Sequence, residues 1–197
     1  MSKFNIEEYL DSLPDDVEKI NVSNKGIKYL PDLSRFKKLE ILYCDENNLT
    51  SLPVLPKNLK ELSCYDNKLT SLPNLPEKLE KLFCLSNNLT LLPDLPENLE
   101  ILNCKNNKLK SLPYLGKHLN MLMLLNNPIH DIVYGGNIKI INKKIKIWNN
   151  FRYLYYCLKY RKRFLKMMEP IIKKRYHPSY LYDLKEEDDL DEKLNEW

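Results

Sequence analysis

A repeat of 20 residues dominates this sequence and restricts what the chain can fold into. Five consecutive blocks share the pattern L-x-x-L-x-C-x-x-N-x-L-x-x-L-P-x-L-P, which decays in the last block. The blocks begin at Leu39, Leu59, Leu79, Leu99 and Leu119. A looser unit at residues 17–38 places its apolar residues at the same offsets. Because one such unit is too small to bury its own leucines, we expect the units to stack into a solenoid.

Each unit supplies one short strand and one extended return. In the L-x-C segment the Leu and Cys side chains point to one side and the intervening residue to the other, because strand side chains alternate. The return carries two prolines, such as Pro53 and Pro56, and proline inside a helix breaks its hydrogen bonding. The predicted fold class is therefore a repeat solenoid with a parallel β-sheet on its concave face and an extended, polyproline-II-like convex wall.

The chain divides into four segments. Residues 1–16 are expected to form an N-terminal helical cap, in which Asn5 caps a helix from Ile6 to about Leu13. Residues 135–182 are expected to form a basic, aromatic-rich helical C-terminal cap, followed by an acidic tail at 183–197. Both caps are needed because an open stack exposes its last leucines. The repeats occupy 17–134, as the units 17–38, 39–58, 59–78, 79–98, 99–118 and 119–134.

The repeat resembles the leucine-rich repeat, in its short 20-residue class with L-P-x-L-P, as found in bacterial effector proteins. The resemblance covers residues 13–133 and implies the same solenoid fold. Effectors of this class can carry a ubiquitin-ligase domain with a catalytic cysteine in a C-x-D motif. Here Cys157 is followed by Leu158 and Lys159, and the region is too short for such a domain. We therefore expect Cys157 to lie on the apolar side of the predicted helix and to pack in the protein core, and not to act as a nucleophile.

The C-terminal segment resembles one found on varied proteins of giant DNA viruses. The similarity rests on Glu169-Pro170, the basic run 173–175, Tyr176-His177-Pro178 and the acidic run that ends at Trp197. It implies no particular activity.

Asparagine and cysteine recur at fixed positions and are expected to be structural. A buried amide ladder would satisfy the backbone groups in the turns of adjacent coils. The thiols would line up in the leucine core. Adjacent ones would be close enough for a disulfide, but their parallel Cβ vectors and a reducing compartment favour free thiols, and ligands in a line do not suit a zinc site. In the first unit Lys25 takes the Asn position, so its bond should be missing or re-routed. The ladder residues are Asn47, Asn67, Asn87, Asn107 and Asn127, with Cys44, Cys64, Cys84 and Cys104.

An aromatic and aliphatic band should occupy the solvent-facing positions of the strands. Ile41, Tyr43, Tyr65, Phe83 and Leu85 fall on outward positions of three neighbouring strands. Exposed apolar patches of this kind usually mark an interface. We therefore predict that these five residues bind a protein partner on the concave face.

The C-terminal helical region is strongly basic. Residues 135–182 hold thirteen Lys and Arg against one Glu, whereas the chain as a whole has a net charge of only +4. A helix is expected from about Asn149 to Met168, and residues 137–148 fit either a short hairpin or its lead-in. The helix would present Arg152, Lys159, Lys162, Arg163 and Lys166 on one face. That face is either a solvated side of the cap or a surface for nucleic-acid phosphates.

Known catalytic patterns are absent from the sequence. No P-loop, GxSxG, HExxH or CxxC occurs, and the three histidines have no partner at an instructive spacing. We therefore predict no catalytic residue, no metal site and no cofactor. Five cysteines without a signal peptide indicate an intracellular, cytoplasmic protein, and no apolar run is long enough to span a membrane.

The predicted function is a non-enzymatic protein–protein interaction module. One alternative is binding of nucleic acid or of an acidic partner through the basic helix. Another is a substrate adaptor for a separate ubiquitin ligase. The identity of the partner and the oligomeric state stay open.

Overall fold

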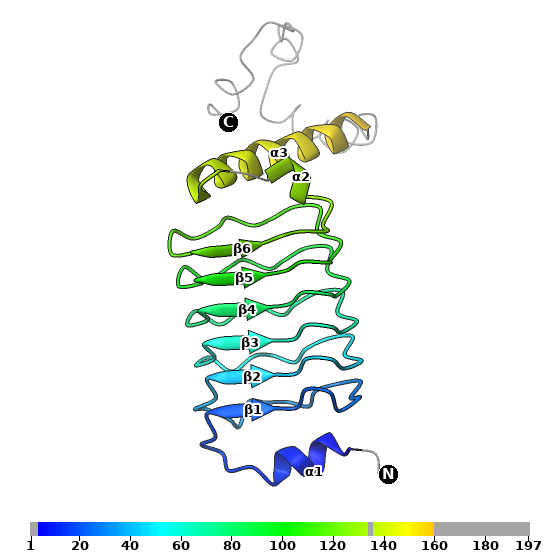
Figure 1. The fold of residues 1–197 in the computed structure, drawn as a ribbon, viewed down its shortest axis with the longest axis vertical. Coiled ribbons are helices and arrows are strands. Elements are labelled where there is room, and N and C mark those ends of the chain that lie inside the picture. The colour runs from blue at the N-terminus through cyan, green and yellow to red at the C-terminus, as the bar shows by residue number, and fades with distance from the viewer. Residues whose placement is uncertain (1–3, 134–135, 160–197) are drawn as a thin grey trace, which may run out of the picture. The chain divides into compact units, whose positions relative to one another are not determined.

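The computed structural model describes residues 4–133 and 136–159, the last nine of them by their backbone only. Within these residues, six strands form one parallel sheet in the order β1 to β6, each strand next to its neighbour in sequence (Figure 1). The strands are β1 (Lys19–Asn21), β2 (Ile41–Tyr43), β3 (Glu61–Ser63), β4 (Lys81–Phe83), β5 (Ile101–Asn103) and β6 (Met121–Met123). The helices are α1 (Ile6–Asp11), α2 (His130–Val133) and α3 (Ile138–Lys159).

The register of the sheet follows the repeat length. Lys19 pairs with Ile41, an offset of 22 residues, and Ile41 pairs with Glu61, an offset of 20. The same offset of 20 continues to β6. Every unit therefore contributes one strand, and the predicted solenoid with its parallel sheet is confirmed.

Each strand begins and ends one residue earlier than the predicted L-x-C segment. Strand β2 covers Ile41–Tyr43, although the amide of Cys44 still donates to the Ser63 carbonyl at 2.9 Å. The carbonyl of Cys44 instead accepts a hydrogen bond from the Asn67 side chain, at 3.0 Å. Strand pairing ends at this point because the Asn67 side chain, and not a backbone amide, donates to the Cys44 carbonyl.

Leucines from successive coils stack into one core behind the sheet. The equivalent residues Leu42, Leu62 and Leu82 are fully buried, as the alternation of side chains along a strand requires. The inward position after each of β2 to β5 holds a cysteine that is buried in the same core, and Val22 and Leu124 take this position after β1 and β6. The core is thus continuous from the first unit to the last.

The recurring asparagines are buried and bonded to backbone in two coils. The Asn67 amide donates to the carbonyls of Cys44 and Cys64, and its oxygen accepts from the Leu49 amide at 2.9 Å. Asn47 serves the first unit in the same way by accepting from the amides of Lys25 and Ile27. Each ladder asparagine bonds to backbone groups of the preceding coil. No coil precedes the first unit, so an asparagine at position 25 would lack these partners.

The return segments of the units up to residue 118 contain neither helix nor strand, in keeping with their prolines, whereas the last unit continues into helix α2. In three of them the second proline accepts a hydrogen bond from the leucine that opens the next unit, as Pro56 does from Leu59 at 3.1 Å. Pro14 accepts from Val17 in the same way, at 3.2 Å. The repeat geometry therefore begins at Pro14, ahead of the first strand.

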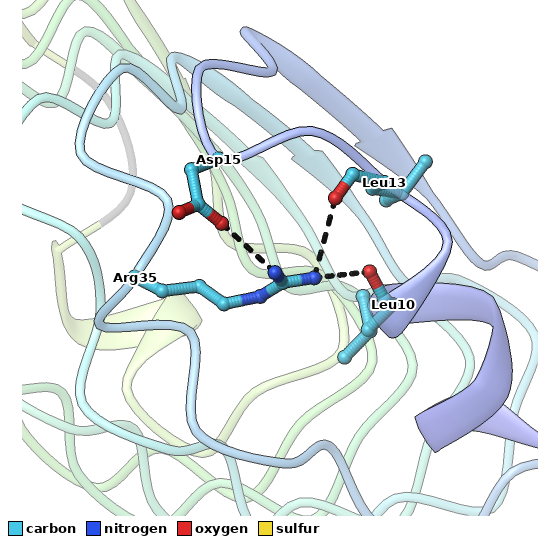
Figure 2. Close-up of polar contacts among 4 residues, drawn as sticks. All are labelled: Leu10, Leu13, Asp15 and Arg35. Carbon is cyan, nitrogen blue, oxygen red and sulfur yellow. Dashed lines mark hydrogen bonds and ion pairs between the residues drawn. The ribbon is translucent and has the colours of Figure 1, made fainter.

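The N-terminal helix α1 caps the first unit. The Asn5 side chain accepts from the amides of Glu7 and Glu8, and Ile6 and Leu10 are buried. Figure 2 shows how the Arg35 guanidinium fastens the end of this helix: it donates to the carbonyls of Leu10 and Leu13 and pairs with Asp15. Arg35 thereby adds a second donor to the Leu10 carbonyl, which also accepts from the Leu13 amide, and supplies a donor to the Leu13 carbonyl just beyond the helix.

Helix α3 begins eleven residues earlier than predicted, so the hairpin alternative for residues 137–148 is wrong. Asn137 caps the helix by accepting from the Ile140 amide at 3.1 Å. Ile145 is buried, while Ile138 and Trp148 pack against the core. The isoleucines of this segment alternate as in a strand, but helical spacing places Ile138 and Ile145 against the core and leaves Ile140 and Ile147 exposed.

Side chains of α3 also bond to the return segment of the unit at 99–118. The Asn142 amide donates to the Leu115 carbonyl at 2.8 Å and accepts from the Leu115 amide at 2.9 Å. The Trp148 indole donates to the carbonyl of Lys110 at 2.9 Å. The helix supplies these backbone groups with partners that a further coil would have supplied.

The boundary between two units of the chain falls after Asn149. The first half of α3 thus belongs with the repeats. Several predictions concern residues outside the described part: the helix beyond Lys159, the basic residues Lys162, Arg163 and Lys166, the virus-like segment and the acidic tail at 183–197.

Candidate functional site

The outward residues of the sheet form what we call the outer face, on the side opposite the leucine core. All five residues predicted to bind a partner lie on it and are half-buried, in contrast to the fully buried leucines between them. They are Ile41, Tyr43, Tyr65, Phe83 and Leu85.

A hollow of about 320 Å³ lies on the outer face over β2, β3 and β4. Four of the five predicted residues line it, whereas Ile41 does not. Three further residues that were not predicted complete the lining. The full set is Tyr43, Asp45, Glu61, Ser63, Tyr65, Phe83 and Leu85.

Asp45 forms the polar floor of this hollow and is only 7% exposed. Its carboxylate accepts from the Ser63 hydroxyl at 2.5 Å, the Tyr65 amide at 3.0 Å and the Ser23 hydroxyl at 3.3 Å. Burial raises the pKa of the Asp45 carboxyl, and these three hydrogen bonds partly offset that rise. A buried carboxylate is costly unless hydrogen bonds satisfy it, and here the two neighbouring coils supply them, Ser23 from one side and Ser63 and Tyr65 from the other.

Both tyrosine rings are fixed by carboxylates of the neighbouring coil. The Tyr43 hydroxyl donates to Glu61 at 2.6 Å, and the Tyr65 hydroxyl donates to Glu46 at 2.9 Å. The bond to Glu61, together with burial, raises the pKa of Tyr43 to about 12. The bond to Glu46 likewise raises the pKa of Tyr65. The rings are therefore held in place before any ligand arrives.

Two lysines of the chain border the hollow. The Lys81 ammonium lies 3.3 Å from the second oxygen of Glu61. The Lys19 ammonium lies over the Tyr43 ring, 4.8 Å from its centroid. Neither lysine is among the lining residues, so the hollow itself contains two carboxylates and no cation.

Sequence reasoning missed Asp45, Glu61 and Ser63. Asp45 occupies an outward position that holds Tyr65, Leu85 and other residues in the later units. The available signal was that an acidic residue two positions after β2 lies diagonally across from a small hydroxyl residue, Ser63, which pairs with Tyr43. Comparing the outward residues of adjacent repeats with one another would have shown that Asp45, Glu61 and Ser63 lie close together.

The cysteines are buried thiols aligned along the core. Burial raises the pKa of Cys64 and Cys84 well above the ordinary range and that of Cys104 to about 12. They are therefore protonated and poor nucleophiles. In the described part of the chain, no three His, Cys, Asp or Glu side chains gather as a metal site requires.

The described part of α3 exposes a different basic stripe from the predicted one. Lys139, Lys143 and Lys146 are exposed at intervals of four and three residues, which places them on one face of the helix. Arg152 and Lys159 lie in the helix by their backbone. None of the helices in residues 4–133 and 136–159 combines the length and hydropathy that crossing a bilayer needs.

Solved structures similar to this chain include two bacterial proteins. YopM from Yersinia enterocolitica WA-314 is 36% identical with a TM-score of 0.56, and the match covers 62% of this chain and 27% of YopM. A Shigella effector leucine-rich repeat domain is 34% identical with the same TM-score, and the match covers 62% of this chain and 54% of that one. The chain thus spans only part of either protein.

No family model and no curated protein matches the sequence. The structural likeness and the sheet together nevertheless identify the fold. The repeats of this chain form a leucine-rich repeat solenoid.

Proposed function

We propose that this chain is a non-enzymatic protein-interaction module whose partner docks on the outer face, centred on the hollow. The observation that carries the proposal is the set of three aromatic rings that line one hollow on adjacent strands. Tyr43, Tyr65 and Phe83 stay half-buried and solvent-facing, although the core leucines beside them are fully buried. Aromatic residues in a concave surface are the side chains that most often dominate protein interfaces.

The surface is also rigid enough to bind without a large ordering cost. Hydrogen bonds to Glu46 and Glu61 hold the two tyrosines, and the β-sheet holds the backbone beneath them. Side chains already fixed lose little conformational entropy on binding. Ile41 and Leu85 extend the apolar area on either side of the rings.

Site-specific photo-crosslinking would test the proposal. A photoreactive phenylalanine analogue is placed at position 83 in one protein and at position 114 in a control. Tyr114 is 65% exposed on a return segment, so it is accessible but lies away from the outer face. We expect protein adducts at position 83 that are absent at position 114 and are lost in the Tyr43→Ala variant. Equal adducts at both positions contradict the proposal.

A second candidate function, nucleic-acid binding through α3, is favoured by the exposed stripe of Lys139, Lys143 and Lys146. The described helix contains no acidic residue, so its positive charge is not compensated within the helix. Phosphate contacts of this kind make affinity fall steeply with salt.

Changing the three lysines of the stripe to glutamate distinguishes this candidate from the first. If nucleic acid is the ligand, the variant loses binding to a labelled single-stranded oligonucleotide, and Phe83→Ala keeps it. If the outer face is the functional surface, the crosslinks at position 83 survive the charge reversal.

A further inference from the structure

The hollow over β2–β4 presents hydrogen-bond acceptors and aromatic faces, with every hydroxyl proton already in use. The hydroxyls of Tyr43, Ser63 and Tyr65 each donate to a carboxylate of the chain. The amide of Tyr65 donates to Asp45 as well. Phe83 and Leu85 bring only apolar surface. A ligand group that enters this hollow must therefore supply donors.

The carboxylates keep capacity for such a donor. An ionised carboxylate has about four acceptor positions. Glu61 uses one for the Tyr43 hydroxyl and one for Lys81, and its side chain is 19% exposed. The floor residue Asp45 accepts three hydrogen bonds. A guanidinium or ammonium group carries donors and no acceptor, so it matches both carboxylates.

The two lysines that border the hollow, at what we call its rim, already make contacts of this kind. The Lys81 ammonium contacts Glu61, and the Lys19 ammonium sits over the face of the Tyr43 ring. These contacts are the two that a bound basic side chain would make: an ion pair with a carboxylate and a cation–π contact with an aromatic ring. Within the hollow itself, no lining residue is positively charged.

Charge around the hollow favours the same ligand. Glu46 and Asp66 follow β2 and β3 at exposed positions on its border. With Asp45 and Glu61 they give four acidic residues against the two lysines of the rim, Lys19 and Lys81. A basic segment is attracted to this surface, and an acidic one is repelled.

We propose that the hollow binds an arginine or lysine side chain of a partner protein, with Asp45 and Glu61 taking its charge and the Tyr43, Tyr65 and Phe83 rings packing against it. This inference rests on the proposed function, because it names the chemistry of the partner at the same site.

A direct binding measurement tests the charge. The probe is a fluorescent peptide of alternating serine and arginine, compared with one in which neutral citrulline replaces every arginine. We expect the full-length chain to bind the arginine peptide and not the citrulline peptide. Glu61→Gln should weaken binding about tenfold, the usual effect of losing one charge-assisted contact.

The matched control is Asp94→Asn, which removes one negative charge from an exposed position on a return segment. It should leave the affinity nearly unchanged. If Asp94→Asn weakens binding as much as Glu61→Gln, the peptide senses only the net charge of the protein and the proposal is overturned. Equal binding of both peptides overturns it too.

Selection from a random-peptide phage library separates this inference from the proposed function. Enrichment of sequences with Arg or Lys that no longer bind Glu61→Gln and Phe83→Ala supports the inference. Enrichment of apolar or acidic sequences that depend on Phe83 but not on Glu61 overturns the inference and keeps the outer face as the binding surface. Enrichment that depends on neither residue overturns both.

Discussion

The hydroxyl of Tyr43 lies 2.6 Å from a carboxylate oxygen of Glu61 and donates a hydrogen bond to it across two strands. The bond is present only while Tyr43 is protonated, and it fixes the ring at the edge of the hollow. It therefore couples the shape of the candidate site to the ionisation of one tyrosine.

Tyr43 should ionise later than an ordinary tyrosine. The hydrogen bond to Glu61 and burial raise its pKa to about 12, from an ordinary value of about 10. The difference between the ultraviolet titrations of the wild type and Tyr43→Phe should therefore show one tyrosinate that forms near pH 12. Because the folded-state pKa is the higher one, this bond stabilises the fold below pH 10 and is lost as pH rises toward 12.

The same titration of the Glu61→Gln variant tests how much the charge of Glu61 contributes to the pKa of Tyr43. It keeps an acceptor for the hydroxyl but removes the negative charge, so the pKa of Tyr43 should fall toward its ordinary value. A titration unchanged by Glu61→Gln would show that the hydrogen bond and burial, and not the negative charge of Glu61, control the pKa of Tyr43.

The stacking of the repeats could be predicted from the sequence because equal spacing brings equivalent residues together. A period of 20 places Leu62 beside Leu42 and Leu82, and no other register buries all three. The outward side chains between them follow from strand alternation. Four of the five predicted binding residues line the hollow for that reason.

The start of α3 and the role of Asp45 could not be predicted in the same way. Residues 138–148 fit both a strand-like and a helical period, and the choice was decided by packing on the last coil and by the Asn137 cap. The Asp45 carboxylate is held by side chains 18 and 22 residues away. Such contacts across coils have no signature in the local sequence.

Removing an amide from the asparagine ladder should destabilise two coils together. Asn67→Ala leaves the buried Leu49 amide without its acceptor, and the Cys44 carbonyl keeps only the Asn47 side chain as a donor. A buried group left unpaired costs about 1–3 kcal/mol, so we expect a loss of about 1–3 kcal/mol in unfolding free energy. Lys68→Ala, at the exposed neighbouring position, should change it little. Denaturant unfolding measures both, and equal midpoints would contradict a structural role for the ladder.

Ser86→Asn should stabilise the repeat array. Ser86 has a left-handed backbone with φ of 53°, and the equivalent positions Asn106 and Asn126 carry the residue that tolerates this conformation best after glycine. Asn126 also donates to the side chain of Asn106 at 2.7 Å, a bond that the new amide could repeat with Asn106. We expect a gain of about 0.5–1 kcal/mol in unfolding free energy. Ser111→Asn, in a return segment, is the control, and an equal gain there would show that backbone strain is not the cause.

The attachment of the N-terminal cap should depend on the carbonyl contacts of Arg35 more than on its ion pair. Asp15 is 74% exposed, and such surface pairs contribute about 0–1 kcal/mol. The same guanidinium bonds the Leu10 and Leu13 carbonyls at the end of α1, and losing donors to partly buried carbonyls costs about 1–3 kcal/mol. Arg35→Met keeps a long unbranched side chain but removes every donor and the guanidinium that lies over the Phe36 ring, so it should destabilise more than Asp15→Asn.

Hydrogen exchange would locate the effect. In Arg35→Met the amides of α1 should exchange faster, while those of β3 and β4 stay protected, because the lost bonds hold only the end of the stack. Asp15→Asn should leave the exchange of α1 nearly as in the wild type. If instead the two variants loosen α1 equally, the ion pair is the main attachment and the carbonyl contacts are secondary.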